Sequence, residues 1–137
     1  MLRTVDAAQA LADLTEISSQ IVHVAIVDRD GGVLASTLGD ERQAGRFAEG
    51  VARLLEEADV AGAVRGLAGF VQLEAATLDG SIFVVRSPAG SSYIAAVTRP
   101  EPTVGLVFYD LKHCLKSVGA PAPPARATRR KKADASS

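Results

Sequence analysis

The sequence has 137 residues, of which 47% are hydrophobic and 23% are charged, and its formal net charge is -1. A chain of this length forms one domain with an ordinary core, and its composition excludes disorder over most of the length. It contains a single cysteine, so no disulfide forms within the chain. It has no basic start followed by an apolar run, as a signal peptide would, and no stretch of about 18 apolar residues that could span a membrane. We therefore expect a cytoplasmic protein.

The chain begins with a predicted helix and a predicted hairpin. Small and apolar residues recur at helical spacing over residues 4–19. Residues 22–27 and 33–36 are short apolar runs on either side of an Asp-Arg-Asp-Gly-Gly segment at 28–32. Two such runs around a Gly-Gly turn indicate a pair of antiparallel strands.

A long amphipathic helix is predicted next. Asp40 is placed to accept hydrogen bonds from its first turn as the N-cap. On the charged side of the helix, Glu49 and Arg53 have the acid-before-base spacing that stabilises helices. The other side is an apolar stripe made of Ala44, Phe47, Ala48, Val51, Leu54, Leu55 and Ala58.

Three further apolar runs predict an antiparallel meander. They span residues 70–77, 82–87 and 93–98, and a connection with glycines at 62, 66 and 69 precedes the first of them. Asp-Gly at 79–80 and Pro-Ala-Gly at 88–90 separate the runs with turn-forming residues. The first run has few charges, and an exposed edge strand of that kind invites pairing with another strand.

A last helix completes the predicted fold. After Pro102, apolar residues repeat at helical spacing over 104–118, and Gly119 is a stop signal. The order helix, two strands, helix, three strands, helix predicts an α+β fold. We expect one five-stranded antiparallel sheet with three helices that together cover both of its faces.

The residues that most often carry catalysis or bind metals do not form a recognisable motif. His23 and His113 are the only histidines, and neither has metal-ligand spacing to Cys114, which lies on the apolar stripe of the last helix. Neither Ser81 nor Ser92 lies in a G-x-S-x-G elbow, and no G-x-x-x-x-G-K-[ST] phosphate loop is present. We therefore expect no enzymatic activity, no cofactor and no metal site.

The C-terminal residues differ from the rest in charge. Residues 119–137 carry five basic side chains and one acidic side chain, whereas residues 1–118 carry ten basic and fifteen acidic ones. The tail is rich in Pro and Ala and cannot bury enough apolar surface to offset the entropy lost on ordering. We expect a folded domain over 1–118 and a disordered tail over 119–137, which either solubilises the protein or uses residues 121–126 and 129–132 to bind a proline-recognising module or an anionic surface.

Three segments together give the sequence a family resemblance. They are HVAIVDRDGGVLAS at 23–36, the long helix after Asp40, and VGLVFYDLKHCL at 104–115. Their residues and their order resemble the Roadblock family, the superfamily of dynein light chains and GTPase regulators, over roughly residues 6–118. The resemblance implies a Roadblock fold for the first 118 residues.

The resemblance also implies an assembly and a partner. Such proteins form homodimers, or occasionally heterodimers, in which the first strand of the meander pairs with its copy and the long helices pack together. They bind small Ras-like GTPases or act as scaffolds. The dimer interface so implied contains Phe47, Val51, Leu54, Phe70, Val71 and Leu73. The partner surface would be the charged side of the long helix, with Arg42, Arg46, Glu49 and Arg53.

Two other functions are compatible with the same sequence. A sheet flanked by helices also describes small-molecule sensory domains, although four Phe, two Tyr and no Trp give a pocket little aromatic lining. An adaptor for anionic surfaces would act through the basic tail, because the rest of the chain is acidic. No residue pattern in the folded part predicts binding to nucleic acid or membranes.

Overall fold

The element order in the computed structural model is the predicted one. The structure describes residues 5–69, 71–87 and 92–119. It is an α+β fold with the order α-β-β-α-β-β-β-α, as predicted. The elements are α1 (Ala7–Ile17), β1 (Ile21–Asp28), β2 (Val33–Ser36), α2 (Glu41–Ala63), β3 (Gln72–Thr77), β4 (Gly80–Arg86), β5 (Ser92–Thr98) and α3 (Val104–Ser117).

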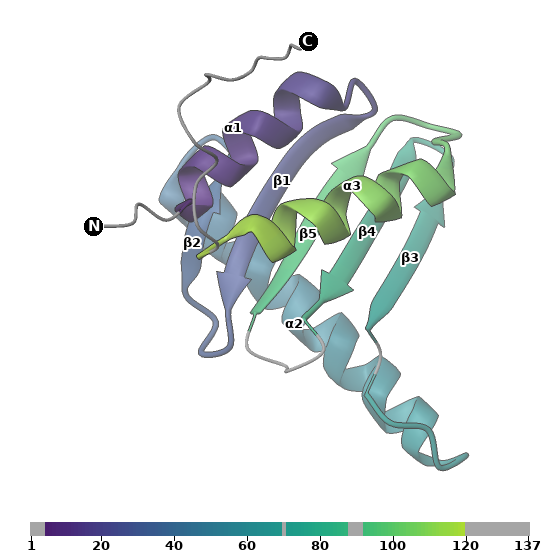
Figure 1. Cartoon of the computed structure of the whole chain (residues 1–137). Helices are drawn as coiled ribbons and strands as arrows, with labels where there is room; N and C mark the ends of the chain where they lie inside the picture. The colour runs from purple at the N-terminus through teal and green to yellow at the C-terminus, as the bar shows by residue number, and fades with distance from the viewer. Residues whose placement is uncertain (1–4, 70, 88–91, 120–137) are drawn as a thin grey trace, which may run out of the picture.

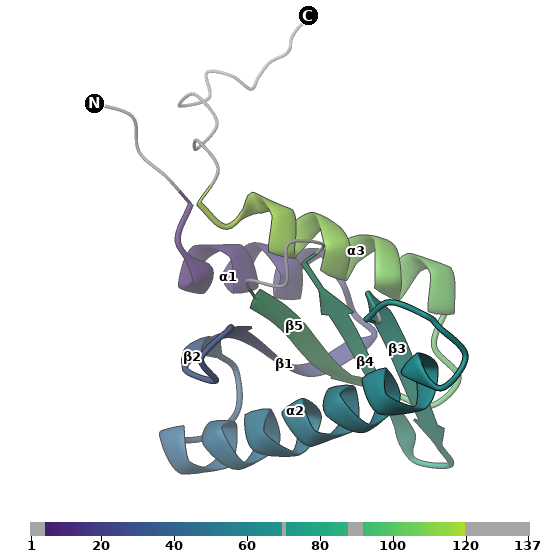
Figure 2. The same cartoon turned by 90° about the horizontal axis from the view of Figure 1, so that it is seen from below.

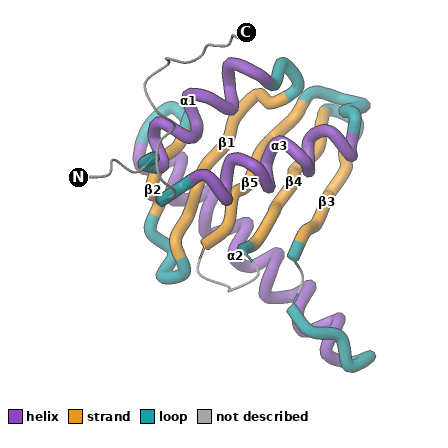
Figure 3. Tube along the Cα trace, in the orientation of Figure 1, coloured by secondary structure: helices purple, strands orange, loops and turns teal. Residues whose placement is uncertain are grey.

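All five strands belong to one sheet with the order β2-β1-β5-β4-β3 (Figures 1 and 3). Every neighbouring pair is antiparallel. The first hairpin joins the meander through β1 and β5, with Ile26 opposite Ile94. The strand β3 is therefore an edge strand, as the sequence predicted, and β2 forms the other edge.

Helices cover both faces of the sheet, in three layers (Figure 2). The helices α1 and α3 lie together on one face, and α2 lies alone on the other. This division follows from the alternation of side chains along each strand, because successive residues point to opposite faces. On β4, for example, Phe83 packs under α1 and α3, whereas Val84 packs against α2.

The ends of the long helix are defined by local hydrogen bonds. The Asp40 carboxylate accepts a hydrogen bond from the Gln43 amide at 2.8 Å, which confirms the predicted N-cap. At the other end the helix continues to Ala63, so Gly62 lies within α2 and not in the connection expected from the sequence. Gly66, with a φ of +76°, then reverses the chain.

The first and last described residues lie side by side. The Gly119 amide donates a hydrogen bond to the Val5 carbonyl at 2.8 Å, so the end of α3 lies next to the start of α1 (Figure 1). Residues 120–137, which hold almost all of the predicted tail, lie outside the described residues. The domain boundary at 118 and the disorder of the tail stay predictions.

Candidate partner-binding surface

The outer edge of β3 is the first part of the candidate surface. Among the described residues β3 pairs with β4 alone, so its other side presents backbone N–H and C=O groups. Val71, just before the strand, is 51% exposed, and Leu73 is half-buried on the face that α2 covers. Phe70 of the implied interface lies outside the described residues.

The half-buried apolar flank of α2 is the second part. Phe47 and Leu54 are half-buried, and Phe47 packs at the border of the core beneath α2 together with Leu73. Val51 is different because it is 3% exposed and already belongs to that core. Of the interface residues on α2, Phe47 and Leu54 therefore keep apolar surface available, while Val51 has little left to bury.

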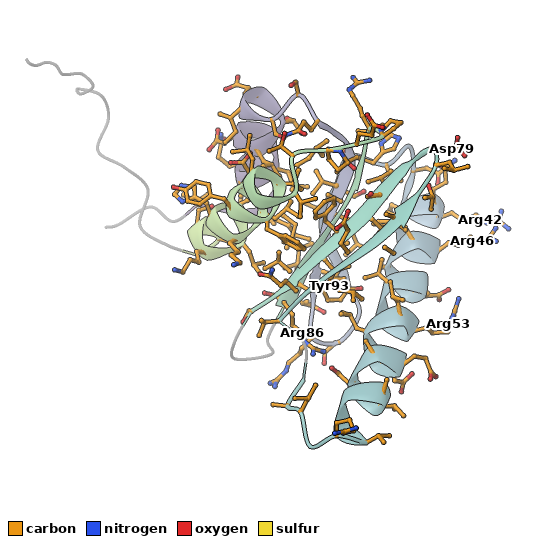
Figure 4. All side chains as sticks on the ribbon, turned by 90° about the vertical axis from the view of Figure 1, so that its right-hand side faces the viewer. Arg42, Arg46, Arg53, Asp79, Arg86 and Tyr93 are labelled. Atoms are coloured by element: carbon orange, nitrogen blue, oxygen red, sulfur yellow. The ribbon has the colours of Figure 1, made fainter. Side chains whose placement is uncertain are left out.

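The outward side of α2 carries the charged residues that we expected to bind a partner. Arg42, Arg46, Glu49 and Arg53 are all exposed. Figure 4 shows the three arginines pointing away from the sheet. Within the described part of the chain none of them forms an ion pair. The three guanidinium groups and the Glu49 carboxylate form an exposed polar stripe along α2.

An ion pair that the sequence did not predict ties the C-terminal part of α2 to the sheet. The Arg86 guanidinium, at the end of β4, donates two hydrogen bonds to the Asp59 carboxylate, at 2.9 and 2.8 Å. The hydrogen bonds to Asp59 raise the pKa of Arg86 above its ordinary value. No sequence signal identifies this pair, because the two residues lie 27 positions apart on different elements.

Two clefts lie beside these elements. A cleft of about 380 Å³ between α2 and the β1–β2 turn contains the Asp59–Arg86 pair and Tyr93. The Tyr93 hydroxyl donates a hydrogen bond to the Ala48 carbonyl at 2.9 Å, and burial raises its pKa. A second cleft, of about 500 Å³, has an apolar lining that includes Val85 and Leu115, and its lining also contains Lys112, Lys116, Val71 and Val118.

The histidines and the cysteine do not come together. His23 is on β1, and the His113 ring stacks on Tyr109 with ring centroids 6.3 Å apart. The Cys114 thiol donates a hydrogen bond to the Ala10 carbonyl at 3.4 Å, and burial raises the pKa of Cys114 to about 11, with the nearby Asp13 carboxylate adding to the shift. A thiol with this pKa is protonated at neutral pH and is a poor nucleophile.

The described residues also contain no assembly of metal ligands. In residues 5–69, 71–87 and 92–119, no three His, Cys, Asp or Glu side chains are grouped so that they could hold a metal ion. The same ranges include no helix with the length and apolar character needed to span a bilayer. The candidate surface therefore consists of a strand edge, an apolar helix flank and a charged stripe, which are elements for binding a macromolecule.

Comparison with solved structures places this arrangement among known folds. The Roadblock/LC7 domain from Streptomyces avermitilis superposes with a TM-score of 0.72 at 18% identity, covering 82% of this chain and 94% of that one. The chain has the Roadblock/LC7 fold. The gliding protein MglB from Thermus thermophilus shares this Roadblock/LC7 arrangement with a TM-score of 0.69 at 16% identity, over 82% of this chain and 85% of that one.

A third similar structure is an MglB with a tetrameric arrangement, at a TM-score of 0.70 and 16% identity, again over 82% of this chain and 85% of that one. No family model and no curated protein sequence matches the chain. The likeness is therefore one of Roadblock/LC7 architecture with little sequence in common. The sequence resemblance to the Roadblock family is confirmed at the level of the fold.

Proposed function

We propose that the protein is a dimeric, non-enzymatic regulatory or scaffolding protein that binds a small Ras-like GTPase. The observations that carry the proposal are the outer edge of β3 and the half-buried apolar residues Phe47 and Leu54 on α2, the helix that covers the sheet face on which Leu73 packs. A strand edge alone is a weak interface, but an edge bordered by an apolar helix flank offers both backbone hydrogen bonds and area to bury.

A dimer with a two-fold axis perpendicular to the sheet uses the β3 edge and the apolar flank of α2 at the same time. It pairs β3 with its copy in the antiparallel sense and keeps the two α2 helices on the same face. Phe47 and Leu54 then meet the corresponding residues of the second copy beneath the joined sheet. Gly50 lies between them on the helix and lets the two backbones approach closely.

The GTPase would bind the outward side of α2. In such a dimer both copies present the stripe with Arg42, Arg46, Glu49 and Arg53 on the same face of the joined sheet, so a partner meets three guanidinium groups from each copy. The proposal assigns these arginines to binding and not to catalysis. A regulator of this kind binds one nucleotide state of the GTPase more tightly, because only differential affinity shifts an equilibrium.

The first experiment tests the dimer. Light scattering and sedimentation at tens of micromolar are expected to give two chains, and Val71→Lys is expected to raise the dissociation constant about tenfold or more. Leu34→Lys is the matched control, because Leu34 is an exposed apolar residue on β2 at the opposite edge of the sheet. A single chain in solution overturns the dimer. Equal effects of the two substitutions place the interface elsewhere.

The second experiment tests the partner. Candidate Ras-like GTPases, sought among the neighbouring reading frames, are titrated in their GDP-bound and GTP-analogue-bound forms. Tighter binding of one form is expected, and Arg46→Glu with Arg53→Glu is expected to slow association at low salt while the dimer persists. Lys112→Glu with Lys116→Glu on α3 is the control on the opposite face. Equal affinity for the two nucleotide states refutes the regulatory role.

A ligand-binding function is the second candidate, and the cleft beside α3 favours it. Its apolar lining together with Lys112 and Lys116 suits an amphipathic carboxylate. Medium-chain fatty acids are the probes for a thermal-shift test. An increase in melting temperature that Lys112→Ala with Lys116→Ala removes would support this candidate, and no shift at millimolar ligand would eliminate it.

A further inference from the structure

The C-terminal part of α2 projects beyond the sheet. We call residues 59–69, the end of α2 and its connection toward β3, the α2 arm. The arm leaves the sheet at the corner where β3 begins (Figures 1 and 4). Val64 is 79% exposed and Leu67 is 59% exposed. Both side chains belong to an ordered turn, in which the Leu67 amide donates a hydrogen bond to the Gly62 carbonyl at 3.0 Å.

The Asp59–Arg86 ion pair fixes this arm to the sheet. Asp59 lies at the start of the arm and Arg86 at the end of β4. Gly69 packs directly on the pair, since a Cβ at this position would lie 2.8 Å from a terminal nitrogen of Arg86. The Arg86 amide also donates a hydrogen bond to the Val71 carbonyl at 2.8 Å. Arg86 of β4 thus contacts both α2, through Asp59, and the residue that precedes β3, through Val71.

A second exposed apolar residue lies at the other end of β3. Leu78, in the β3–β4 turn, is 97% exposed. The turn itself is held in place, because the Thr77 hydroxyl donates to the Gly80 carbonyl at 2.7 Å and accepts from the Asp79 amide at 3.1 Å. Gly80 has a φ of +153°, and a Cβ there would lie 2.2 Å from the Thr98 carbonyl oxygen. A leucine is therefore presented to solvent from a well-defined turn.

The two-fold axis of the proposed dimer brings the two features together. When β3 pairs antiparallel with its copy over its whole length, Gln72 of one copy lies opposite Thr77 of the other. The arm ends just before Gln72, and the turn with Leu78 begins just after Thr77. Each end of the joined strands therefore combines the arm of one copy with the turn of the other.

We propose that Leu78 of each copy packs against Val64 and Leu67 in the α2 arm of the second copy, so that an apolar contact covers each end of the paired β3 strands. Asp59 and Arg86 act as a positioning pair that holds the arm where the incoming leucine meets it. The inference rests on the proposed dimer, and it adds a contact that neither the strand edge nor the helix flank requires. The partner for these exposed apolar residues is a second copy of the chain, because the arm and the turn lie at the two ends of the strand that pairs in the proposed dimer.

Crosslinking between copies tests the contact directly. In the variant Leu67→Cys with Leu78→Cys, oxidation is expected to give a disulfide-linked dimer on a non-reducing gel. Within one copy the two positions lie beyond opposite ends of β3, a six-residue strand about 20 Å long, so they are too far apart for a disulfide. The native Cys114 is buried and does not compete. The control is Leu34→Cys with Leu67→Cys, which is expected to stay uncrosslinked.

The outcomes separate this inference from the proposed function. A wild-type protein that is monomeric refutes both. A wild-type dimer whose Leu67→Cys, Leu78→Cys variant does not crosslink, or crosslinks no better than the control pair, refutes only the contact made by Leu78. Leu78→Ser provides a second readout, because it leaves the fold intact and is expected to raise the dimer dissociation constant at least about threefold. An unchanged constant counts against the contact.

The positioning role of the ion pair has its own test. Arg86→Ala is expected to lower the yield of the 67–78 crosslink at least about threefold, because the arm loses its anchor. Asp59→Arg combined with Arg86→Asp restores an ion pair in the reverse sense and is expected to recover the yield. If Arg86→Ala lowers the melting temperature but leaves the crosslink yield unchanged, the pair has a purely structural role.

Discussion

The two faces of the sheet differ in how completely helices cover them. Under α1 and α3 the side chains of Leu14, Phe83 and Leu111 are fully enclosed. Under α2 the centre of the sheet is equally buried, but Phe47 on the helix and Leu73 on β3 keep part of their surface in contact with water. Two helices span one face, whereas a single helix must cover the other, and it leaves a half-buried strip that includes Phe47, Leu54 and Leu73.

This difference separates the residues that stabilise the protomer from those available for assembly. A change under α1 and α3 alters the free energy of unfolding and leaves the outer surface as it was. A change along the strip between α2 and β3 costs the protomer little, because water already reaches those side chains. The predictions that follow test whether the two sides are independent in this way.

The largest expected effect is that of Leu111→Ala on the closed face. Leu111 is fully buried, so its truncation leaves a cavity and is expected to lower the free energy of unfolding by about 3 kcal/mol. Leu54→Ala, on the strip beneath α2, is expected to cost about 1 kcal/mol or less. Urea unfolding of both variants in a Val71→Lys background isolates the protomer from dimerisation. Equal losses would contradict the division between the faces.

The second prediction concerns pH and the buried thiol of the closed face. Because Cys114 is protonated up to a pKa of about 11 in the folded protein, while an exposed thiol ionises near pH 9, the unfolded state binds fewer protons between these values. The free energy of unfolding is therefore unaffected by this thiol below pH 9. It falls by on the order of 2 kcal/mol as the pH rises from 9 to about 11. Urea unfolding at pH 8.5 and 11 is compared between the wild type and Cys114→Ala, which is expected to lack this loss.

The third prediction concerns the strip itself. Phe47→Ser is expected to raise the dimer dissociation constant about tenfold, which corresponds to about 1.4 kcal/mol, while the melting temperature of a Val71→Lys background changes by only a few degrees. Sedimentation equilibrium measures the first quantity and calorimetry the second. If Phe47→Ser strongly lowered the melting temperature and left the dimer dissociation constant unchanged, Phe47 would belong to the protomer core.

Local signals were sufficient to predict most of the elements. The N-cap Asp40, the strand at 33–36 and the turn at 28–32 each depend on a few neighbouring residues, and the structure has them where the sequence indicated. The end of α2 was misplaced because Gly62 suggested a connection, whereas the helix continues to Ala63 and the Gly62 carbonyl accepts hydrogen bonds from the Arg65 and Leu67 amides in the turn that follows. Helix propensity is a weak preference that structural context overrides.

The candidate surface was less accessible to sequence reasoning. The apolar stripe of α2 identifies which residues leave water, but it does not distinguish Val51, enclosed within the protomer, from Phe47 and Leu54 at its border. That distinction depends on the angle at which one helix crosses the sheet. The Asp59–Arg86 pair depends on the same angle, so no spacing in the sequence could indicate it.

The smallest expected effect is that of removing residues 120–137. Gly119 is kept, because its amide donates a hydrogen bond to the Val5 carbonyl and closes the end of α3. The described core residues of both faces precede the deletion, so the melting temperature is expected to change by no more than about 2 °C. Binding to vesicles containing phosphatidylserine, measured by cosedimentation, is expected to be weaker for the truncated chain at low salt, because the deletion removes five basic side chains. A melting temperature lowered by many degrees would mean that the tail packs on the domain, and vesicle binding that survives the deletion would move the anionic-surface site from the tail to the acidic body.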